Sequence, residues 1–149
     1  MNSLQLSSSA FAYGGAIPAR YTCDGEDANP PLAIDRVPTG TKSLALIVDD
    51  PDAPVGLWVH WVLWNIHPQI RQFGEKIVPA DAIQGRNSWG RTSYGGPCPP
   101  SGTHRYFFKL YALDTILKLG SGTTKAELER AMEGHVIGKG ELMGTYRRK

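Results

Sequence analysis

The sequence predicts a mainly β protein, built as a sandwich with one or two short helices. Its strongest apolar stretches are short, which is typical of strands rather than of free-standing helices. Glycine and proline account for 17 and 11 of the 149 residues and are spread along the chain without a period. Such dispersed punctuation is typical of many short strands joined by irregular loops. The length fits one domain over residues 1–149 that can bury a sizeable core.

The chain is organised around residues 44–54, which read Leu-Ala-Leu-Ile-Val-Asp-Asp-Pro-Asp-Ala-Pro. The five apolar residues in a row predict a buried strand over residues 43–48. The acids and prolines that follow cannot continue a β-ladder. The strand therefore ends with Asp50 and Asp52 close to its last residue.

A second strand is predicted from Trp58 to Ile66, and it carries a histidine between two tryptophans. Strict alternation places four of its side chains on one face of the sheet and the intervening ones on the other. The first set is Trp58, His60, Val62 and Trp64. Because both faces are apolar, we expect both to be covered. If the two strands are antiparallel neighbours, His60 lies beside Asp50.

A long loop and a third strong strand follow. Residues 84–102 show no periodicity, and an irregular loop of this length inside a compact domain is usually functional. An ordered cover over a sheet edge is an equally good interpretation. The glycines of the loop allow backbone N–H groups to turn toward a ligand. The strand His104–Leu113 then alternates so that His104 and Tyr106 point in the same direction.

The remaining predicted elements are shorter. Residues 124–127 form a capping box, and apolar residues follow at helical spacing, which predicts a helix over about residues 124–133. Weaker alternation indicates strands at residues 4–8, 32–34 and 140–146.

The totals restrict the class of protein. The net charge of +2 argues against a nucleic-acid-binding protein. The chain shows neither a leader pattern nor an apolar run of about eighteen residues, so we expect a cytoplasmic protein without a membrane span. Cys23 and Cys98 make neither a disulfide framework nor a metal motif, and reduced thiols are expected, with a single bridge as the alternative. The basic tail 147–149 is expected to be solvated.

The residues capable of chemistry lie at strand ends: Asp50, Asp52, His60, His104 and Tyr106. Each has an ordinary structural role when taken alone, so the case for a site depends on whether they converge. A metal site lacks the HxH or HExxH spacing. Nucleophilic hydrolysis lacks GxSxG, and Cys98 lies between prolines with no evident base. A phosphate-binding P-loop is absent.

The remaining interpretation is a cleft of hydrogen-bond donors. Imidazole N–H, tyrosine O–H and loop N–H groups suit an anion such as a phosphate monoester. The acids then orient and charge a histidine. We expect Asp50 to favour the imidazolium form of His60 and to raise its pKa.

Three blocks of the sequence resemble one known family, the phosphatidylethanolamine-binding proteins, which include the Raf kinase inhibitor proteins. The first block is residues 50–54 with Trp-Val-His-Trp at 58–61. The second is Gly-Gly-Pro-Cys-Pro-Pro at 95–100 with Gly-Thr-His-Arg-Tyr at 102–106. The third, Tyr-Thr-Cys-Asp-Gly at 21–25 with Pro-Pro-Leu at 30–32, is similar to a block usual in the prokaryotic branch. The match runs from about residue 4 to residue 146.

The resemblance implies an antiparallel Greek-key β-sandwich with a small pocket for phosphate-like anions. It also makes it plausible that Cys23 and Cys98 lie in loops near that pocket, where a bridge requires Cα atoms within about 7 Å. Carried onto this chain, the pocket is lined by Asp50, Trp58, His60, Gly96, Pro100, His104 and Tyr106. Asp52, from the first block, joins these as a candidate ligand-binding residue.

The expected function is binding of a phosphate-type anion or phospholipid headgroup, with a regulatory role like that of a kinase or protease inhibitor. The alternative is a hydrolase acting on a small phosphate or ester. We expect no enzymatic activity, cofactor, metal, nucleic-acid partner or membrane insertion. A kinase or protease is the expected protein partner, and a homodimer is an open alternative to the monomer.

Overall fold

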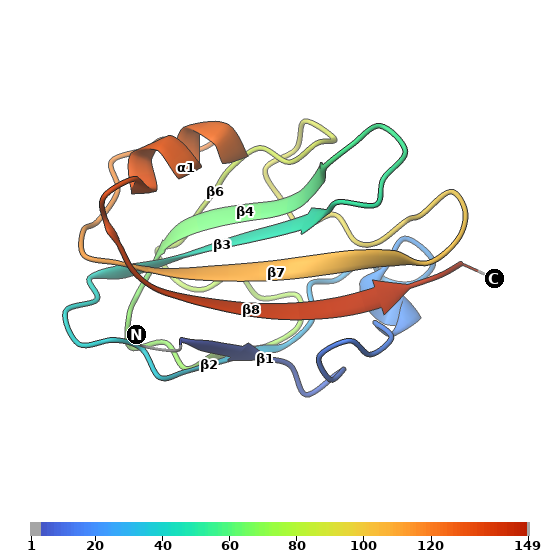
Figure 1. The fold of residues 1–149 in the computed structure, drawn as a ribbon, viewed down its shortest axis with the longest axis horizontal. Coiled ribbons are helices and arrows are strands. Elements are labelled where there is room, and N and C mark those ends of the chain that lie inside the picture. The colour runs from blue at the N-terminus through green and yellow to red at the C-terminus, as the bar shows by residue number, and fades with distance from the viewer. Residues whose placement is uncertain (1–3, 149) are drawn as a thin grey trace.

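The computed structural model describes residues 4–148, and the strands of this part of the chain form two antiparallel sheets. The larger sheet has the strand order β6-β4-β3-β7-β8, and the smaller has the order β1-β2-β5 (Figure 1). The strands are β1 (Gln5–Ser7), β2 (Leu32–Asp35), β3 (Ser43–Asp50), β4 (Trp58–Ile66), β5 (Gln72–Phe73), β6 (Ile83–Gln84), β7 (His104–Leu113) and β8 (Val136–Tyr146). These described residues also contain one α-helix, α1 (Lys125–Met132), and a 3-10 turn, Ala19–Tyr21. The predicted mainly β fold is confirmed.

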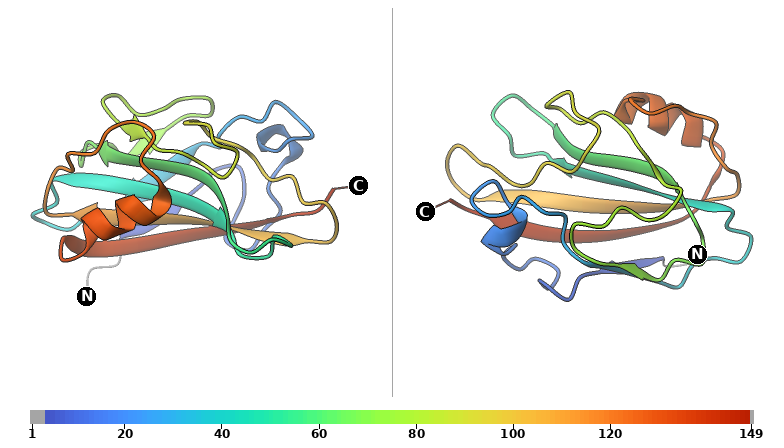
Figure 2. Two further views of the ribbon diagram at one scale, coloured as in Figure 1. Left: turned by 90° about the horizontal axis from the view of Figure 1, so that it is seen from above. Right: turned by 180° about the vertical axis from the view of Figure 1, so that it is seen from behind.

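The central strand β3 is buried along its whole length, and it lies between β4 and β7. One hydrophobic core fills the space between the two sheets, and a second lies on the opposite face of the large sheet, where Leu128 and Met132 of α1 pack. Figure 2 shows α1 on one side of the large sheet and the small sheet with its loops on the other. Both faces of β3 and β4 are therefore covered, as their apolar sequences predict.

The predicted strict alternation along β4 is wrong, because its pairing with β3 shifts register twice, and the shift near His60 affects the site. Val48 lies opposite Trp61 and Asp49 lies opposite Val59, so His60 is an extra residue in a β-bulge. Trp61 belongs to the core between the sheets, and the ring of His60 approaches Tyr106, which belongs to the same core. Val62 belongs to the core under α1. The bulge therefore moves His60 to the face opposite Val62.

The shorter elements largely follow the predictions. The helix begins after Thr124, whose side chain forms the predicted capping box with Glu127. The predicted last strand is longer than expected, because β8 begins at Val136. The two-residue strands β5 and β6 carry too little periodicity for the sequence to indicate them.

The long loop continues from β6 along the edge of β4 that faces away from β3. Gly85, Ser88 and Gly95 donate backbone N–H groups to carbonyl oxygens of β4, at 2.7, 2.9 and 3.0 Å respectively. The buried Asn87 orders the intervening turn, because its side-chain oxygen accepts from two loop N–H groups and its amide donates to Ser93. The loop is thus an ordered cover over a sheet edge, and it also brings Gly95 against His60.

The expectation of two free thiols is wrong. Cys23 and Cys98 form a disulfide, and their Cα atoms lie 5.4 Å apart. The prediction of thiols was based on the usual redox state of the cytosol, which says nothing about the distance between the two cysteines. The fold places the two segments side by side, since Cys23 also donates its backbone N–H to the carbonyl oxygen of Pro97 at 3.1 Å.

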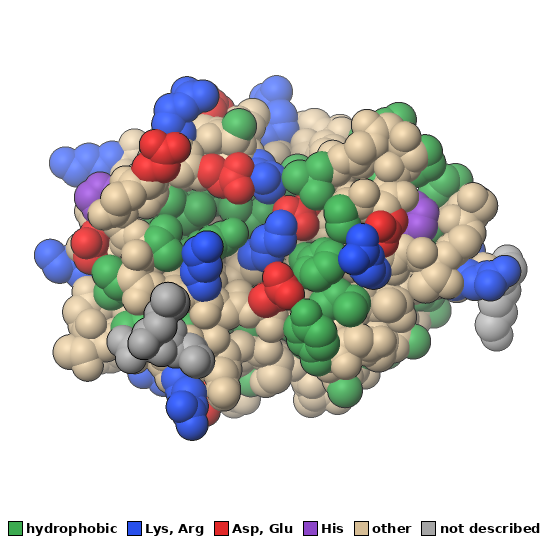
Figure 3. Space-filling model, viewed as in Figure 1, with side chains coloured by type: hydrophobic (Ala, Val, Ile, Leu, Met, Phe, Trp, Pro, Cys, Tyr) green, Lys and Arg blue, Asp and Glu red, His purple; other side chains and the backbone are tan. Residues whose placement is uncertain are grey.

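The surface carries charges of both signs, and basic and acidic side chains are interspersed on the face seen in Figure 3. Arg147 and Arg148 are exposed, and Arg148 forms a surface ion pair with Asp24 at 3.1 Å. Lys149, the last residue of the expected solvated tail, lies outside the described residues. Between residues 4 and 148, no helix has the length and apolarity that a membrane crossing needs.

Candidate functional site

Adjacent strand ends bring four of the predicted site residues together. Asp50 ends β3, His60 lies near the start of β4, and His104 and Tyr106 lie at the start of β7. The ring centroids of His60 and Tyr106 are 5.2 Å apart, and those of His104 and Tyr106 are 6.4 Å apart. Antiparallel pairing on both sides of β3 causes this convergence, because the start of each neighbour lies beside the end of β3.

Asp50 and His104 form a buried pair. The Nδ1 atom of His104 lies 2.7 Å from Oδ2 of Asp50, and the two residues are only 6% and 3% exposed. The other carboxylate oxygen, Oδ1, accepts the backbone N–H of Asp52 at 2.7 Å. Since a carboxylate only accepts, Nδ1 of His104 carries a proton and donates it. Asp50 therefore fixes the orientation of the His104 ring and keeps a proton on its Nδ1 atom.

His60 has a different partner from the one predicted. Its Nδ1 atom donates to the carbonyl oxygen of Gly95 at 2.7 Å, and the residue is only 3% exposed. Burial lowers the pKa of His60 below 6.5, although the Gly95 carbonyl and the charge of Asp50 oppose this shift. The expectation that Asp50 raises this pKa is therefore wrong. The short hydrogen bonds of Asp50 go to His104 and Asp52, and burial disfavours the charged form of the His60 imidazole.

Tyr106 brings an unpaired donor to the site. Its hydroxyl is buried and has no hydrogen-bond partner within residues 4–148. Burial, followed by the charge of Asp50, raises the pKa of the hydroxyl well above 10, so it stays protonated. A buried hydroxyl without a partner costs free energy in a folded protein. Such a group is suited to donate to a bound acceptor.

Asp52 lies at the edge of this cluster and is paired with Arg105. It accepts from the backbone N–H, Nε and Nη2 of Arg105 at 2.9, 2.9 and 2.8 Å. These hydrogen bonds hold the pKa of Asp52 at about 2. A carboxylate already held by a bidentate arginine is poorly placed to contact an anion. Its geometry supports a role in fixing the turn after β3.

The loop residues contribute less directly than expected. Gly96 is buried, and its N–H donates to Oδ1 of Asp27 at 2.8 Å, so this donor is already used. Pro100 is exposed, and it lines a separate surface cavity of about 660 Å³ together with Asp24, Gly102 and Arg148.

Trp89, which the sequence did not predict as a site residue, packs against His60, and the predicted site residue Trp58 contacts Trp89. Trp89, from the long loop, lies 5.1 Å from the His60 ring and 5.5 Å from that of Trp58, in edge-to-face geometry. Trp89 is 38% exposed, so it lies between His60 and solvent. Gly95 lies so close to the Trp89 ring that a Cβ atom there would overlap it. In the sequence, Trp89 is marked only by being an aromatic residue within the irregular loop 84–102, for which a functional role was one interpretation.

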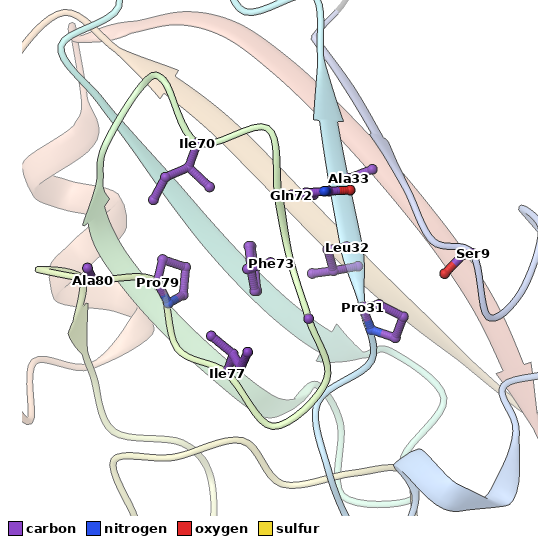
Figure 4. A pocket seen from close by; sticks show the side chains of 11 residues that line it. Ser9, Pro31, Leu32, Ala33, Ile70, Gln72, Phe73, Ile77, Pro79 and Ala80 are labelled. Atoms are coloured by element: carbon purple, nitrogen blue, oxygen red, sulfur yellow. The ribbon is translucent and has the colours of Figure 1, made fainter.

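A second cavity, of about 610 Å³, lies beside the small sheet (Figure 4). Its lining is mostly apolar and includes Leu32, Ile70, Phe73, Ile77 and Pro79. Among residues 4–148, no charged side chain and no residue of the cluster around His60 lines it, so these residues offer no cationic partner for an anion there.

Together, the fold and the site define a β-sandwich protein with a buried His–His–Tyr–Asp cluster at one end of its central strands. The chain belongs to the phosphatidylethanolamine-binding protein family, whose model matches residues 7–147. The UPF0098 protein of Methanothermobacter thermautotrophicus is 53% identical over 150 residues, covering 97% of this chain and 99% of that one.

Solved structures agree with this assignment. A Chlamydia trachomatis protein, described as a homologue of phosphatidylethanolamine-binding proteins, superposes with a TM-score of 0.96 at 45% identity over the whole of both chains. Escherichia coli YbcL, described as a new member of the mammalian family, superposes with a TM-score of 0.91 at 31% identity over 99% of each chain.

Proposed function

We propose that this protein binds a phosphate-type anion, such as a phosphate monoester or a phospholipid headgroup, at His60, His104 and Tyr106. The buried, unpaired hydroxyl of Tyr106 is the observation that carries the proposal, because it is a neutral donor held next to two imidazoles. Membership of the family is consistent with ligand binding.

Binding at this site requires a proton. Because His60 uses its Nδ1–H on Gly95, its second ring nitrogen, Nε2, can donate to an anion only in the imidazolium form. Burial disfavours that form in the free protein, and a bound anion favours it. Proton uptake should therefore accompany binding, and affinity should fall as pH rises.

Calorimetric titration with phenyl sulfate tests the proposal, because a sulfate monoester keeps one charge while a phosphate monoester gains its second near pH 6. Tyr106→Phe should weaken binding about ten- to hundredfold, since a hydrogen bond to a charged group contributes about 1.5–3 kcal/mol. Tyr111→Phe is the matched control, because Tyr111 lies on the same strand and packs against the core under α1. Equal affinities of the Tyr106 variant and the wild type would refute the proposal.

The regulatory part of the function rests on family membership alone. We propose that a kinase or a protease is the partner, and a panel of both enzymes assayed with and without this protein tests it. The absence of inhibition at a large excess of the protein would count against it. A cytoplasmic location stays a prediction, and the Cys23–Cys98 disulfide counts against it, since cytosolic thiols are usually kept reduced.

A hydrolase is the second candidate function, and the buried Asp50–His104 pair favours it. A carboxylate that orients a histidine through Nδ1 is a common arrangement for a general base. Steady release of phenol from phenyl phosphate or phenyl acetate, lost in Asp50→Asn and in His104→Gln, would support a hydrolase. Turnover that survives both changes would exclude this pair as its catalytic base.

A further inference from the structure

The disulfide holds the loop segment that contacts His60 of the candidate site. Cys23 and Cys98 are both exposed, so a reductant in solution can reach the bond. Cys98 follows Gly95 by three residues, in the same segment that supplies the hydrogen-bond acceptor of His60. The exposed disulfide is therefore covalently connected to the backbone segment that holds His60.

The segment 94–98 is held between two other parts of the chain. On one side, Gly95 donates its N–H to the carbonyl oxygen of His60 at 3.0 Å and accepts from Nδ1 of His60 at 2.7 Å. On the other side, Gly96 donates to Asp27, and Cys23 donates to Pro97.

The partner segment, residues 21–27, is anchored in the protein at its start. Tyr21 and Thr22 are buried, and a Cβ atom at Gly96 would overlap the carbonyl oxygen of Tyr21. While the disulfide is intact, it ties segment 94–98 to residues 21–27 at Cys98. After reduction, hydrogen bonds and the packing of Tyr94 against Trp61 still hold the segment, and local opening then requires less free energy.

We propose that Cys23–Cys98 is a thiol–disulfide exchange site for a dithiol reductant, and that its redox state controls the contact between Gly95 and His60. A thiolate of the reductant attacks one sulfur, the bond between the two cysteines breaks, and the other cysteine leaves as a thiolate. The second thiol of the reductant then attacks the mixed disulfide. The reductant becomes a disulfide, and Cys23 and Cys98 become thiols.

Reduction should weaken anion binding, a consequence that rests on the proposed function. His60 keeps its orientation and its Nδ1 proton only while the Gly95 carbonyl is in place. A larger population of opened segment lowers the fraction of molecules competent to bind, and the apparent affinity falls by that fraction.

Amide hydrogen exchange tests the coupling without any ligand. The folded protein is treated with dithiothreitol, the thiols are counted, and exchange is compared between the oxidised and reduced forms by NMR. The N–H groups of Gly95 and Gly96 should exchange about tenfold faster after reduction. Gly85, which donates to Val62 along the same edge of β4, is the internal control and should change by less than about twofold.

Two further measurements complete the test. The variant Cys23→Ser with Cys98→Ser should match the reduced form and no longer respond to dithiothreitol. Phenyl sulfate should bind about threefold more weakly to the reduced protein.

A disulfide that is reduced only in denaturant, unchanged exchange at Gly95 and Gly96, or equal affinities of the two redox forms would overturn the inference. If neither form binds the probe while exchange still responds to reduction, the proposed function fails and the redox coupling stands.

Discussion

His60 donates its Nδ1–H to the carbonyl oxygen of Gly95 over 2.7 Å, although 35 residues separate them in the chain. The contact exists because the loop after β6 follows the edge of β4 and because a bulge turns His60 toward Tyr106. It decides which ring nitrogen carries the proton in the neutral state. It also links the chemistry of the site to a loop held by a disulfide.

Stability should depend on pH through His60. Its pKa is lowered in the folded state, so the unfolded chain binds more protons at acidic pH. The contribution of the neutral ring is fully present above about 6.5, the unfolded value, and is lost as pH falls from there toward the lowered pKa. Urea unfolding of wild type and His60→Gln between about pH 5 and 8 measures it. The difference in unfolding free energy between the two proteins should change across this window, and a constant difference would contradict the lowered pKa of His60.

Asp50→Ala should destabilise the fold strongly. The change leaves the Nδ1–H of buried His104 without an acceptor, and breaking a buried pair typically costs about 3–5 kcal/mol. Asp50→Asn keeps an oxygen acceptor and should cost less. Denaturant unfolding of both variants checks the order. Small losses in both variants would show that the contact between Asp50 and His104 does not stabilise the fold.

Denaturation without reductant should expose no free thiols, because Cys23 and Cys98 are bonded. The double serine variant should lose about 2–4 kcal/mol of unfolding free energy, since the bond constrains a long segment of the unfolded chain. A thiol reagent and denaturant unfolding give the two readouts. Two free thiols in the purified oxidised protein would contradict the structure.

Gly96→Ala should destabilise the protein, whereas Gly120→Ala should not. A Cβ atom at Gly96 would overlap the Tyr21 carbonyl and the Asp27 carboxylate, while at Gly120 it would meet no atom of residues 4–148 within 4 Å. Overpacking of this kind costs about 1–3 kcal/mol, and the rigid backbone neighbour places Gly96→Ala at the upper end. Thermal unfolding of the two variants gives the comparison. Similar melting temperatures would show that segments 21–27 and 94–98 can separate freely.

Removal of residues 147–149 should change stability by less than about 1 kcal/mol. Arg147 and Arg148 are exposed, and the ion pair from Arg148 to Asp24 lies at the surface. Melting curves of the shortened and full chains should nearly overlap. Arg148→Ala should reproduce the small effect, and a large loss in either variant would show that the tail stabilises the fold.

The sequence by itself determined where the three main strands lie. The apolar run before Asp50, the segment Trp58–Ile66 and the segment His104–Leu113 are strands in the structure, because burial on both faces imposes a pattern that periodicity detects. The capping box at Thr124 fixed the start of the helix, since its hydrogen bonds are local. The placement of Asp50, His60, His104 and Tyr106 at strand ends followed from these strands.

Only the tertiary structure decided how those residues interact. The bulge at His60, the pairing of Asp50 with His104, the Gly95 acceptor, the cover by Trp89 and the disulfide all join residues that are distant in sequence or shift a strand by one residue. Strand alternation gives a face only while the register is regular, and a single extra residue reverses it. The direction of a pKa shift depends on burial and on the nearest partner, both of which are set by the packing of distant segments.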